Sequence, residues 1–306
     1  MHAANPFHEG ELKAQQLSGE AEMGASNGAM IGHTIMSGAL NFIRAQEMVV
    51  VSSRDNAGRR WASLLFGKKG FLQPNGASEL RIALDPSRTD GGDPLWKNLE
   101  SDSRAGLLVI DLETRRRLRI NGKLQRNGLA LEMSVEESYP NCPKYITRRE
   151  MKIVAREQST ADSERLSGAE LQTRQKELIE STDLLFMATG HLKRGADASH
   201  RGGKPGFVEV LDERRLRIPD YPGNSMFNSL GNLLVDAHVG LLIPDFVANR
   251  QLQITGKAKV EWSAKDVAGV TGGTKRFVEV EIDDWLERPL AVKVESKILD
   301  YSKYNP

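Results

Sequence analysis

A repeat within the chain constrains its fold more than any other feature of the sequence. Residues 105–123 read AGLLVIDLETRRRLRINGK, and residues 239–257 read VGLLIPDFVANRQLQITGK. Aligned without a gap, they place Gly106 on Gly240 at an offset of 134 (240 − 106), and their Gly-Lys pairs also coincide. Agreement this dense over 19 positions predicts that the 306-residue chain contains two copies of one structural unit.

Two weaker echoes extend the repeat toward the N-terminus. Ser63 aligns with Ser199 at an offset of 136, and residues 95–99 can be laid on residues 226–230 at an offset of 131. Because the offset changes along the chain, we expect small insertions and deletions in the loops between the retained elements.

Short strands dominate both copies. Their apolar residues alternate or form short runs, which is typical of strands. The expected strands span residues 46–53, 81–84, 107–111, 115–120, 183–190, 206–211, 215–218, 239–243, 250–254 and 277–282. Helices are expected at residues 8–22, 93–101 and 225–234. Asn121-Gly122 and Thr255-Gly256 mark turns or bulges after matching strands. This pattern favours a small barrel in each copy over a parallel α/β sheet.

A polar stretch separates the copies. Residues 159–181 are rich in Glu, Gln, Leu, Lys and Arg with few apolar positions, which predicts a solvated helical connector. We therefore divide the chain into an N-terminal unit at residues 1–155 with a helical N-terminal extension, a connector at residues 156–182 and a C-terminal unit at residues 183–306.

The composition of the chain excludes several classes of protein. Forty-two Lys and Arg against 41 Asp and Glu leave a net charge of +1, which does not suggest a polyanion-binding surface. The single cysteine, Cys142, rules out an intrachain disulfide and a Cys-based zinc site and suits a reducing compartment, so we expect a cytoplasmic protein. Residues 1–20 show no secretory signal, and no apolar run approaches a membrane span, so no membrane partner is expected.

No side-chain catalytic motif is evident. The six histidines form no i, i+4 pair and no HExxH motif, and neither a GxSxG elbow nor a phosphate loop is present. Lys144 lies close to Cys142 in the sequence, but without a paired histidine a structural thiol is the preferred interpretation. We therefore predict no catalytic side chain and no metal site.

The basic run at residues 115–117, with Arg119, invites a nucleic-acid interpretation. The strand has no interleaved aromatic residues and the net charge is near zero, so a nucleic-acid partner is not expected. A solvated barrel face, or a clamp for one small anion, fits this strand better.

Residues 199–232 are the richest in polar and glycine positions. Arg201 can bind a phosphate in a bidentate manner, and Ser199, Asn224 and Ser229 offer neutral donors. If residues 225–234 are helical, Asn224 lies at the N-cap, where free N–H groups favour an anion. The alternative, that these are turn residues closing a barrel, is equally compatible with the spacing.

These residues carry a resemblance to a known family. The second half resembles the pyridoxamine 5'-phosphate oxidase-related FMN-binding family, the split-barrel flavoproteins. The matching stretches are Ser199-x-Arg201-Gly202-Gly203, Gly206-Phe207-Val208, Asp220-Tyr221-Pro222-Gly223-Asn224, Phe227-x-Ser229-Leu230, Val239-Gly240-Leu241-Leu242 and Arg250-Gln251-Leu252-x-Ile254-x-Gly256. The first half looks like the companion unit of a two-unit subgroup, with marks at residues 7–11, 115–122 and 141–146.

The resemblance implies a mainly β fold of tandem split barrels, each a six-stranded Greek key, with FMN held non-covalently between them. It implies an intrachain pair in place of a homodimer, and leaves a further homodimer open. The family's phosphate-binding positions fall on Ser199, Arg201 and the loop from Asn224 to Ser229, and Gln251 matches the strand glutamine that lies against the flavin. Such enzymes act on small molecules, and NADH or NADPH is a candidate electron donor.

Three departures modify these expectations. Ser225-Met226 stands where many relatives carry a basic residue, so Lys204, Arg250 or the other unit is expected to complete the phosphate clamp. Residues 292–299 contain no Arg or His, so pyridoxamine phosphate oxidation itself is not expected. The first unit has residues 90–94 in place of a PGN loop, which predicts an altered or lost pocket there. The alternative function is a non-catalytic flavin- or haem-binding module for storage, sensing or electron hand-over.

Overall fold

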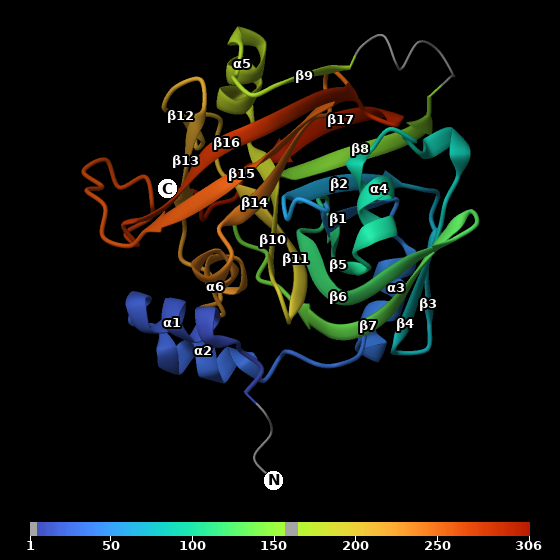
Figure 1. The fold of residues 1–306 in the computed structure, drawn as a ribbon, viewed down its shortest axis with the longest axis horizontal. Helices are drawn as coiled ribbons and strands as arrows, with labels where there is room; N and C mark the ends of the chain where they lie inside the picture. The colour runs from blue at the N-terminus through green and yellow to red at the C-terminus, as the bar shows by residue number, and fades with distance from the viewer. Residues whose placement is uncertain (1–4, 157–164) are drawn as a thin grey trace.

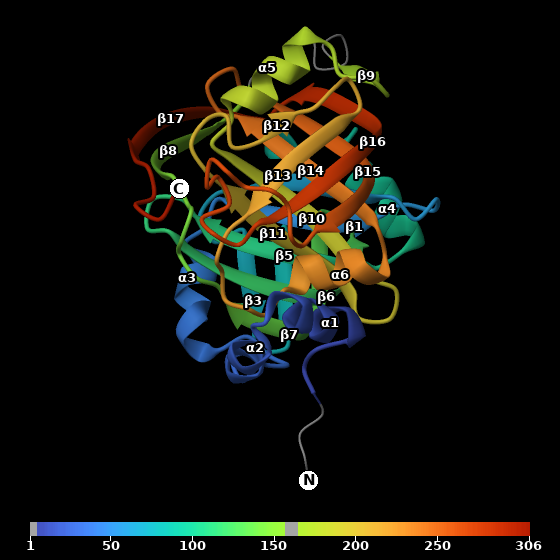
Figure 2. The same ribbon diagram turned by 90° about the vertical axis from the view of Figure 1, so that its left-hand side faces the viewer.

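A computed structural model of the chain describes residues 5–156 and 165–306. These residues are mainly β, and most strands belong to two large antiparallel sheets, one from each half of the sequence (Figure 1, Figure 2). None of the helices among them is long and apolar enough to cross a membrane.

The two sheets have the same strand order. The first runs β2-β1-β5-β6-β7-β4-β3, and the second runs β11-β10-β14-β15-β16-β13-β12. The strands of the first sheet are β1 (Met48–Arg54), β2 (Arg60–Phe66), β3 (Leu72–Asn75), β4 (Glu79–Ala83), β5 (Arg104–Asp111), β6 (Arg116–Asn127) and β7 (Ala130–Pro140). Those of the second are β10 (Leu184–His191), β11 (Gly195–Gly202), β12 (Glu209–Val210), β13 (Arg215–Asp220), β14 (His238–Asp245), β15 (Arg250–Glu261) and β16 (Arg276–Pro289).

This repeated order confirms the predicted fold class, a mainly β chain with two barrel units of one type. Each path has seven strands where six were expected, because the short strands β3 and β12 extend one edge. The strand expected at residues 206–211 is present only as β12.

Each unit also places a helix at the same point of the repeat. These helices are α4 (Pro94–Ser101) and α6 (Asn228–Val235). The side chain of Asn98 bonds that of Ser53 at 2.9 Å, and Asn232 bonds Thr189 at 3.1 Å in the same way. The helices therefore match at an offset of 134 (232 − 98), like the strands that follow them, which corrects the expected offset of 131.

The remaining helices of the described residues, apart from two short 3₁₀ turns, are α1 (Glu9–Ser18), α2 (Ala21–Gly28), α3 (Leu40–Arg44) and α5 (Thr173–Ser181). The single helix expected at residues 8–22 is thus two helices, because Gly19 adopts a left-handed φ of 72° and ends α1. Helix α1 packs against α6 of the second unit (Figure 1). Glycines permit this crossing, since a Cβ on Gly10 would lie 2.1 Å from the carbonyl oxygen of Gly231.

The connector is only partly helical. Its residues 157–164 lie outside the described residues. After them β9 (Leu166–Gly168) pairs with β16, and α5 begins at Thr173. The prediction of a helix is therefore wrong at β9, where pairing with the long edge of β16 decides the conformation.

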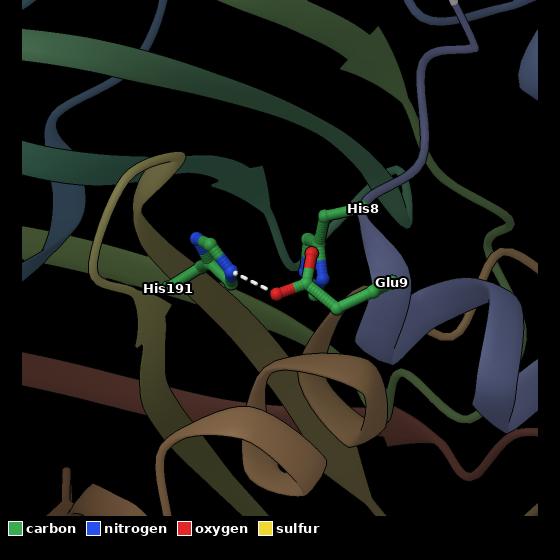
Figure 3. Close-up of side chains that lie close together, drawn as sticks. All are labelled: His8, Glu9 and His191. Atoms are coloured by element: carbon green, nitrogen blue, oxygen red, sulfur yellow. Dashed lines mark hydrogen bonds and ion pairs between the residues drawn. The ribbon is translucent and has the colours of Figure 1, made fainter.

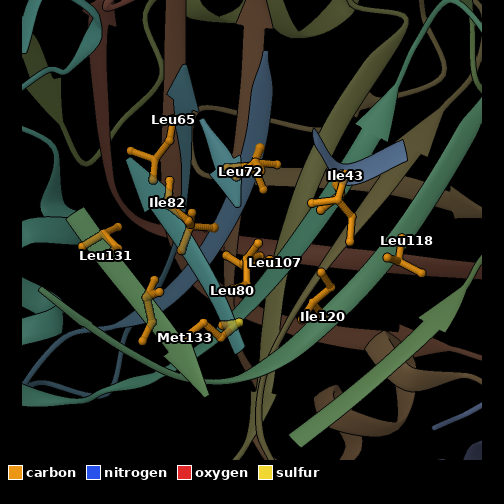
Figure 4. Close-up of a cluster of buried hydrophobic side chains, with 14 of the residues drawn as sticks. Ile43, Leu65, Leu72, Leu80, Ile82, Leu107, Leu118, Ile120, Leu131 and Met133 are labelled. Atoms are coloured by element: carbon orange, nitrogen blue, oxygen red, sulfur yellow. The ribbon is translucent and has the colours of Figure 1, made fainter. Parts of the chain in front are cut away.

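Each barrel encloses its own apolar core. Alternation along β6 places Leu118 and Ile120 inside the first barrel, 2% and 0% exposed (Figure 4). Leu252 and Ile254 of β15 occupy the same places in the second barrel. Both long strands contain a bulge at the glycine that the sequence marks.

A third apolar core joins the barrels. Val50 and Leu108 of the first unit pack in one cluster with Phe186 and Leu242 of the second. β8 (Arg148–Ala155) and β17 (Val292–Asp300), which follow the two sheets, pair antiparallel with each other beside this cluster (Figure 2). The two units therefore share buried surface and form one body.

The backbones approach most closely at two equivalent glycines. A Cβ on Gly106 would lie 2.6 Å from the carbonyl oxygen of Ala196, and a Cβ on Gly240 would lie 2.6 Å from that of Arg60. Ala196 and Arg60 are themselves equivalent positions of β11 and β2. The contact is thus symmetric, and the repeat forms an intrachain pair about a pseudo-twofold axis.

Candidate functional site

An interface pocket lies between the two barrels. Its lining residues are Arg117, Arg119, Asn141, Cys142, Lys144 and Tyr145 from the first unit and His200, Arg201, Gly202, Phe207, Pro219, Tyr221, Gly223 and Asn224 from the second. An adjoining helix-end hollow lies at the start of α6 and also includes Arg276, Asn228 and Ser229. Arg119, Arg201 and Tyr221 line both. Neither unit forms this site alone.

Three arginines surround the helix-end hollow. Arg201 on β11 pairs with Asp220 at 3.0 Å, and Arg276 pairs with the same carboxylate at 2.9 Å. Arg119 of the first unit pairs with Asp197 at 3.2 Å. Burial, which Asp220 opposes, lowers the pKa of Arg201. The Nε atoms of Arg119 and Arg201 have no hydrogen-bond partner among the described residues, so both guanidinium groups retain donor capacity.

Within residues 5–156 and 165–306, no side chain caps the first turn of α6. The helix begins at Asn228, later than expected, and its N-cap is Phe227. Asn224 is therefore not the N-cap; its Oδ1 accepts a backbone N–H two residues on, at 3.2 Å. Ser225 and Phe227 both have a φ of 59°, which turns the loop before the helix can start. A helix N-terminus without a cap leaves backbone N–H groups that favour an anion.

Two of the predicted hydroxyl groups lie together beside this hollow. The Oγ of Ser229 is 3.0 Å from that of Ser199 and 3.2 Å from Asp197 Oδ2. Both serines are almost fully buried. The structure therefore brings Ser199, Arg201 and Ser229 to one place and puts Asn224 in the lining of both cavities.

Arg250 and Gln251 line neither the interface pocket nor the helix-end hollow. Arg250 pairs with Asp245 at 3.3 Å and with Glu287 at 3.0 Å. Gln251 is buried on β15, on the strand face it shares with Gln253. Gln253 donates to a backbone carbonyl of the first unit at 2.7 Å. This face of β15 therefore belongs to the pseudo-twofold counterpart of the site, which we call the mirrored site.

The reason is that each site combines the helix end of one unit with a strand of the other unit. β15 is the repeat counterpart of β6, so Arg117 and Arg119 stand where Gln251 and Gln253 stand in the mirrored site. In a homodimer of single-unit proteins, the strand residue has the same number in both subunits. A comparison of the second half with such proteins therefore does not show whether Gln251 or its first-unit counterpart, Arg117, lines the site.

The interface pocket is cationic, and none of the described residues that line it is Asp or Glu. Arg117 donates to the carbonyl oxygen of Cys142 at 2.8 Å and lies 3.5 Å from His200 Nδ1. Burial and the neighbouring Arg119 lower the pKa of Arg117 to about 9. The solvated-face interpretation of this strand is therefore wrong for Arg117 and Arg119, which point into the interface, whereas the anion-clamp alternative agrees with their positions.

His200 is a neutral donor in this pocket. Burial, followed by the charges of Arg117 and Arg201, lowers the pKa of His200 well below its usual range. Because Nδ1 accepts from Arg117, the ring hydrogen lies on Nε2. That nitrogen is buried and has no hydrogen-bond partner among the described residues.

Helix α1 adds a buried carboxylate to the first turn of α6. Glu11 accepts from the side chain of Asn228 at 2.6 Å and from the backbone N–H of His8 at 2.8 Å. Burial raises the pKa of Glu11 to about 7 and lowers that of His8 to about 4. Both groups therefore titrate outside their ordinary ranges because α1 seals them against the second unit.

His8, Glu9 and His191 cluster where α1 meets the end of β10 (Figure 3). Their ligand atoms lie within 4.8 Å of one another, a spacing that a metal ion could use. However, Nδ1 of His8 and Nδ1 of His191 accept backbone N–H groups at 3.1 and 3.0 Å. Each Nε2 therefore carries the hydrogen and donates, to Asn232 and Glu9 respectively. These hydrogen bonds favour a structural role, in which the cluster holds α1 against the second unit, over a metal centre.

In the mirrored site, the first unit supplies its own anion. Asp93 caps α4 by accepting from Leu95 N at 2.8 Å, and it accepts from Ser63 Oγ at 2.6 Å. The guanidinium of Arg288 lies 2.6 Å from Asp93 and 2.7 Å from Gln253 Oε1. The Arg288 side chain is fully buried.

Position by position, the two sites have diverged. The hydroxyl is retained at Ser63 and Ser199. Leu65 stands at the place of Arg201, and Asp93 at the place of Phe227. The expectation of an altered pocket in the first unit agrees with this geometry.

Sequence reasoning missed three site residues. Arg276, at the start of β16, follows a loop with no motif, and no signal in the sequence marks it. Glu11 lies in the N-terminal extension, and only the fold brings it to α6. His200 could have been found, because it lies between Ser199 and Arg201 in the stretch richest in polar and glycine residues.

No family model matches the sequence, and no curated protein matches it. Among solved structures, the chain is similar to a provisionally assigned pyridoxamine 5'-phosphate oxidase from Lactobacillus delbrueckii, with 18% identity, a TM-score of 0.32, and coverage of 40% of this chain and 97% of that one. It is also similar to the FAD-binding protein from Mycobacterium smegmatis, with 12% identity, a TM-score of 0.27, and coverage of 40% and 98%.

A third similar structure is a Clostridium acetobutylicum protein related to general stress protein 26, of the pyridoxinephosphate oxidase family. It has 12% identity and a TM-score of 0.28, and the match covers 41% of this chain and 92% of that one.

Proposed function

We propose that the protein is an FMN-binding oxidoreductase of the split-barrel class that acts on a small molecule, with its cofactor site at the second barrel. The contrast between the two helix ends carries the proposal. Asp93 caps α4, whereas α6 is uncapped and is approached by Arg119, Arg201 and Arg276. In the first barrel the carboxylate of Asp93 binds the helix end. In the second barrel the arginines and the backbone N–H groups at the start of α6 are donors for the anion of a ligand.

The donor set of the helix-end hollow fits the phosphate of FMN. Guanidinium groups match phosphate oxygens in a bidentate manner, and two of them here have an unpartnered Nε. The backbone N–H groups at the start of α6 add neutral donors. Asp220 already pairs with Arg201 and Arg276, so it fixes both guanidinium groups in place before a ligand arrives.

When bound, FMN supplies the hydride chemistry, so the chain needs no nucleophile of its own. Its residues bind, orient and enclose. Arg201 and Arg276 would hold the phosphate. Tyr145 of the first unit and Tyr221 of the second, with ring centroids 4.8 Å apart, wall the pocket between the barrels. NADH or NADPH is the proposed electron donor, and the cytoplasm is the proposed place of action.

Reconstitution with FMN tests the proposal. We expect flavin absorption bands that bleach with NADH or NADPH and return when an acceptor is added. Arg201→Ala should weaken FMN binding by about 1.5–3 kcal/mol, the scale of a hydrogen bond to a charged group. Arg215→Ala removes an exposed arginine of β13 and serves as the matched control, with unchanged affinity. Gln251→Leu should also leave the affinity unchanged, because Gln251 faces the mirrored site.

Three results would count against the proposal. Failure to take up FMN, or a haem Soret band in its place, rejects the cofactor. Equal FMN affinity in the wild type and Arg201→Ala rejects the assigned site. Bound FMN that neither nicotinamide donor reduces, with no turnover of any acceptor, rejects catalysis and favours a binding module.

A further inference from the structure

The interface pocket contains positive charge beyond the two arginines that it shares with the helix-end hollow. Arg119 and Arg201 are shared with the hollow and have the carboxylates of Asp197 and Asp220 as partners. Arg117 has no carboxylate partner among the described residues; it contacts a backbone carbonyl and the ring of His200. It lines the interface pocket but not the hollow. An anion bound in the helix-end hollow therefore does not pair with Arg117.

An enclosed cation without a counter-ion is costly. The energetic penalty of desolvating a charge is repaid only when an opposite charge or a full set of hydrogen bonds replaces the lost water. Around Arg117 the neighbours have the opposite effect, because Arg119 and Arg201 repel it and contribute to the low pKa of its guanidinium. A bound anion would relieve this repulsion.

A buried donor of the second unit lies beside the same space. The Nε2–H of His200 is buried, lines the pocket and has no hydrogen-bond partner among the described residues. His200 itself is only 5% exposed. Lys144 adds a third cation from the first unit, after Arg117 and Arg119, and Tyr145 adds an aromatic wall. A ligand with an anionic head and a planar apolar body would satisfy these groups together.

We propose that the interface pocket binds the anionic head, a carboxylate or a phosphate, of a planar organic substrate, with Arg117 as its anchor. His200 and Lys144 are further donors. The first barrel thus supplies the substrate anchor, and the second supplies most of the cofactor phosphate site. Naming the ligand as the substrate rests on the proposed function; the anion site itself does not.

Calorimetric titration of the full chain, with and without FMN, tests this site. The probes are benzoate and phenyl phosphate, which distinguish the two anion sources, and benzyl alcohol as their neutral analogue. We expect at least one anion to bind, and Arg117→Gln to weaken it by about tenfold or more, the loss of one charge-assisted hydrogen bond. Arg116→Gln is the matched control on the same strand, exposed and facing the other way. If Arg117→Gln does not fold, Lys144→Gln should still weaken the anion severalfold.

The outcomes separate this site from the cofactor proposal. An anion that binds through Arg117 in a chain that takes no FMN supports this site and rejects the proposed function. FMN that binds while neither anion binds the loaded chain rejects this site alone. Equal affinities of the wild type and Arg117→Gln also reject it. If Arg117→Gln loses FMN binding, and if bound FMN prevents the binding of both anions, then Arg117 binds the cofactor. That result overturns the proposed substrate site.

Discussion

The ends of helices α4 and α6 occupy the same place in two copies of one fold, yet they are satisfied in opposite ways. In the first barrel, Asp93 supplies a carboxylate to the start of α4, and the buried Arg288 neutralises it. In the second barrel, the residue at the position of Asp93 is Phe227, so α6 has arginines around it but no carboxylate cap. A homodimer could not differ in this way, because its two sites share every residue.

Shape has been retained where chemistry has diverged. The symmetric close approach requires glycine in both copies at Gly106 and Gly240, and both bulges require it at Gly122 and Gly256, where a Cβ would lie about 2 Å from a backbone oxygen. These positions fix how the barrels pack. The polar residues around the two helix ends are free of that constraint, so one site can become structural while the other stays open to a ligand.

Arg288→Met tests the structural role of the mirrored site and has the largest expected effect. It leaves the buried Asp93 carboxylate without its cation, which should lower the free energy of unfolding by about 3–5 kcal/mol. Urea unfolding measures this loss.

Two further variants are compared with Arg288→Met. Arg201→Met, at the partly exposed site of the second barrel, should cost less, because Asp220 keeps Arg276 as a partner. Replacing Asp93 by Asn together with Arg288→Met should recover part of the stability, because no uncompensated charge remains. A loss below about 1 kcal/mol in Arg288→Met would show that the first barrel does not depend on its internal ion pair.

Glu11→Gln tests the seal that α1 places over the second barrel alone. The pKa of Glu11 is raised from 4.5 to about 7, so the folded chain holds a proton that the unfolded chain releases between these values. The stabilisation is present below about pH 4.5 and is lost as the pH rises to about 7, by about 3 kcal/mol. His8 acts in the opposite direction, because its lowered pKa costs stability as the pH falls from 6.5 to about 4.

The comparison with the wild type isolates Glu11 from His8. Unfolding free energies measured from pH 4.5 to 7.5 should show Glu11→Gln gaining on the wild type as the pH rises. Glu22→Gln, an exposed glutamate of α2, should run parallel to the wild type. Parallel curves for Glu11→Gln as well would mean that α1 does not seal this carboxylate.

The fold could be predicted largely because its signals are local or repeated. Alternation put Leu118 and Ile120 inside the barrel, and the repeat marked the glycines of the interface and the bulges. Strand β9 could not be predicted, because pairing with β16, far away in the chain, overrides the helical composition of the connector.

The site could be predicted only in part. Ser199, Arg201 and Ser229 lie in stretches with a recognisable motif, and the structure brings them together. Gln251 shares a strand face with Gln253, which contacts the first unit, and no motif in the sequence indicates that this face belongs to the mirrored site. Arg276 joins the hollow only through β16, and Glu11 joins it only through the docking of α1, so no spacing in the sequence encodes either contact.

The stoichiometry of FMN binding tests the asymmetry of the two barrels most directly. Calorimetric titration of the wild type should reach saturation at one FMN per chain, and the combined variant Arg119→Gln, Arg201→Ala should lose that binding. Arg288→Met, if it remains folded, should keep a single equivalent, because Asp93 still occupies the end of α4. Two equivalents per chain in the wild type, or one that survives the loss of Arg119 and Arg201, would contradict the account.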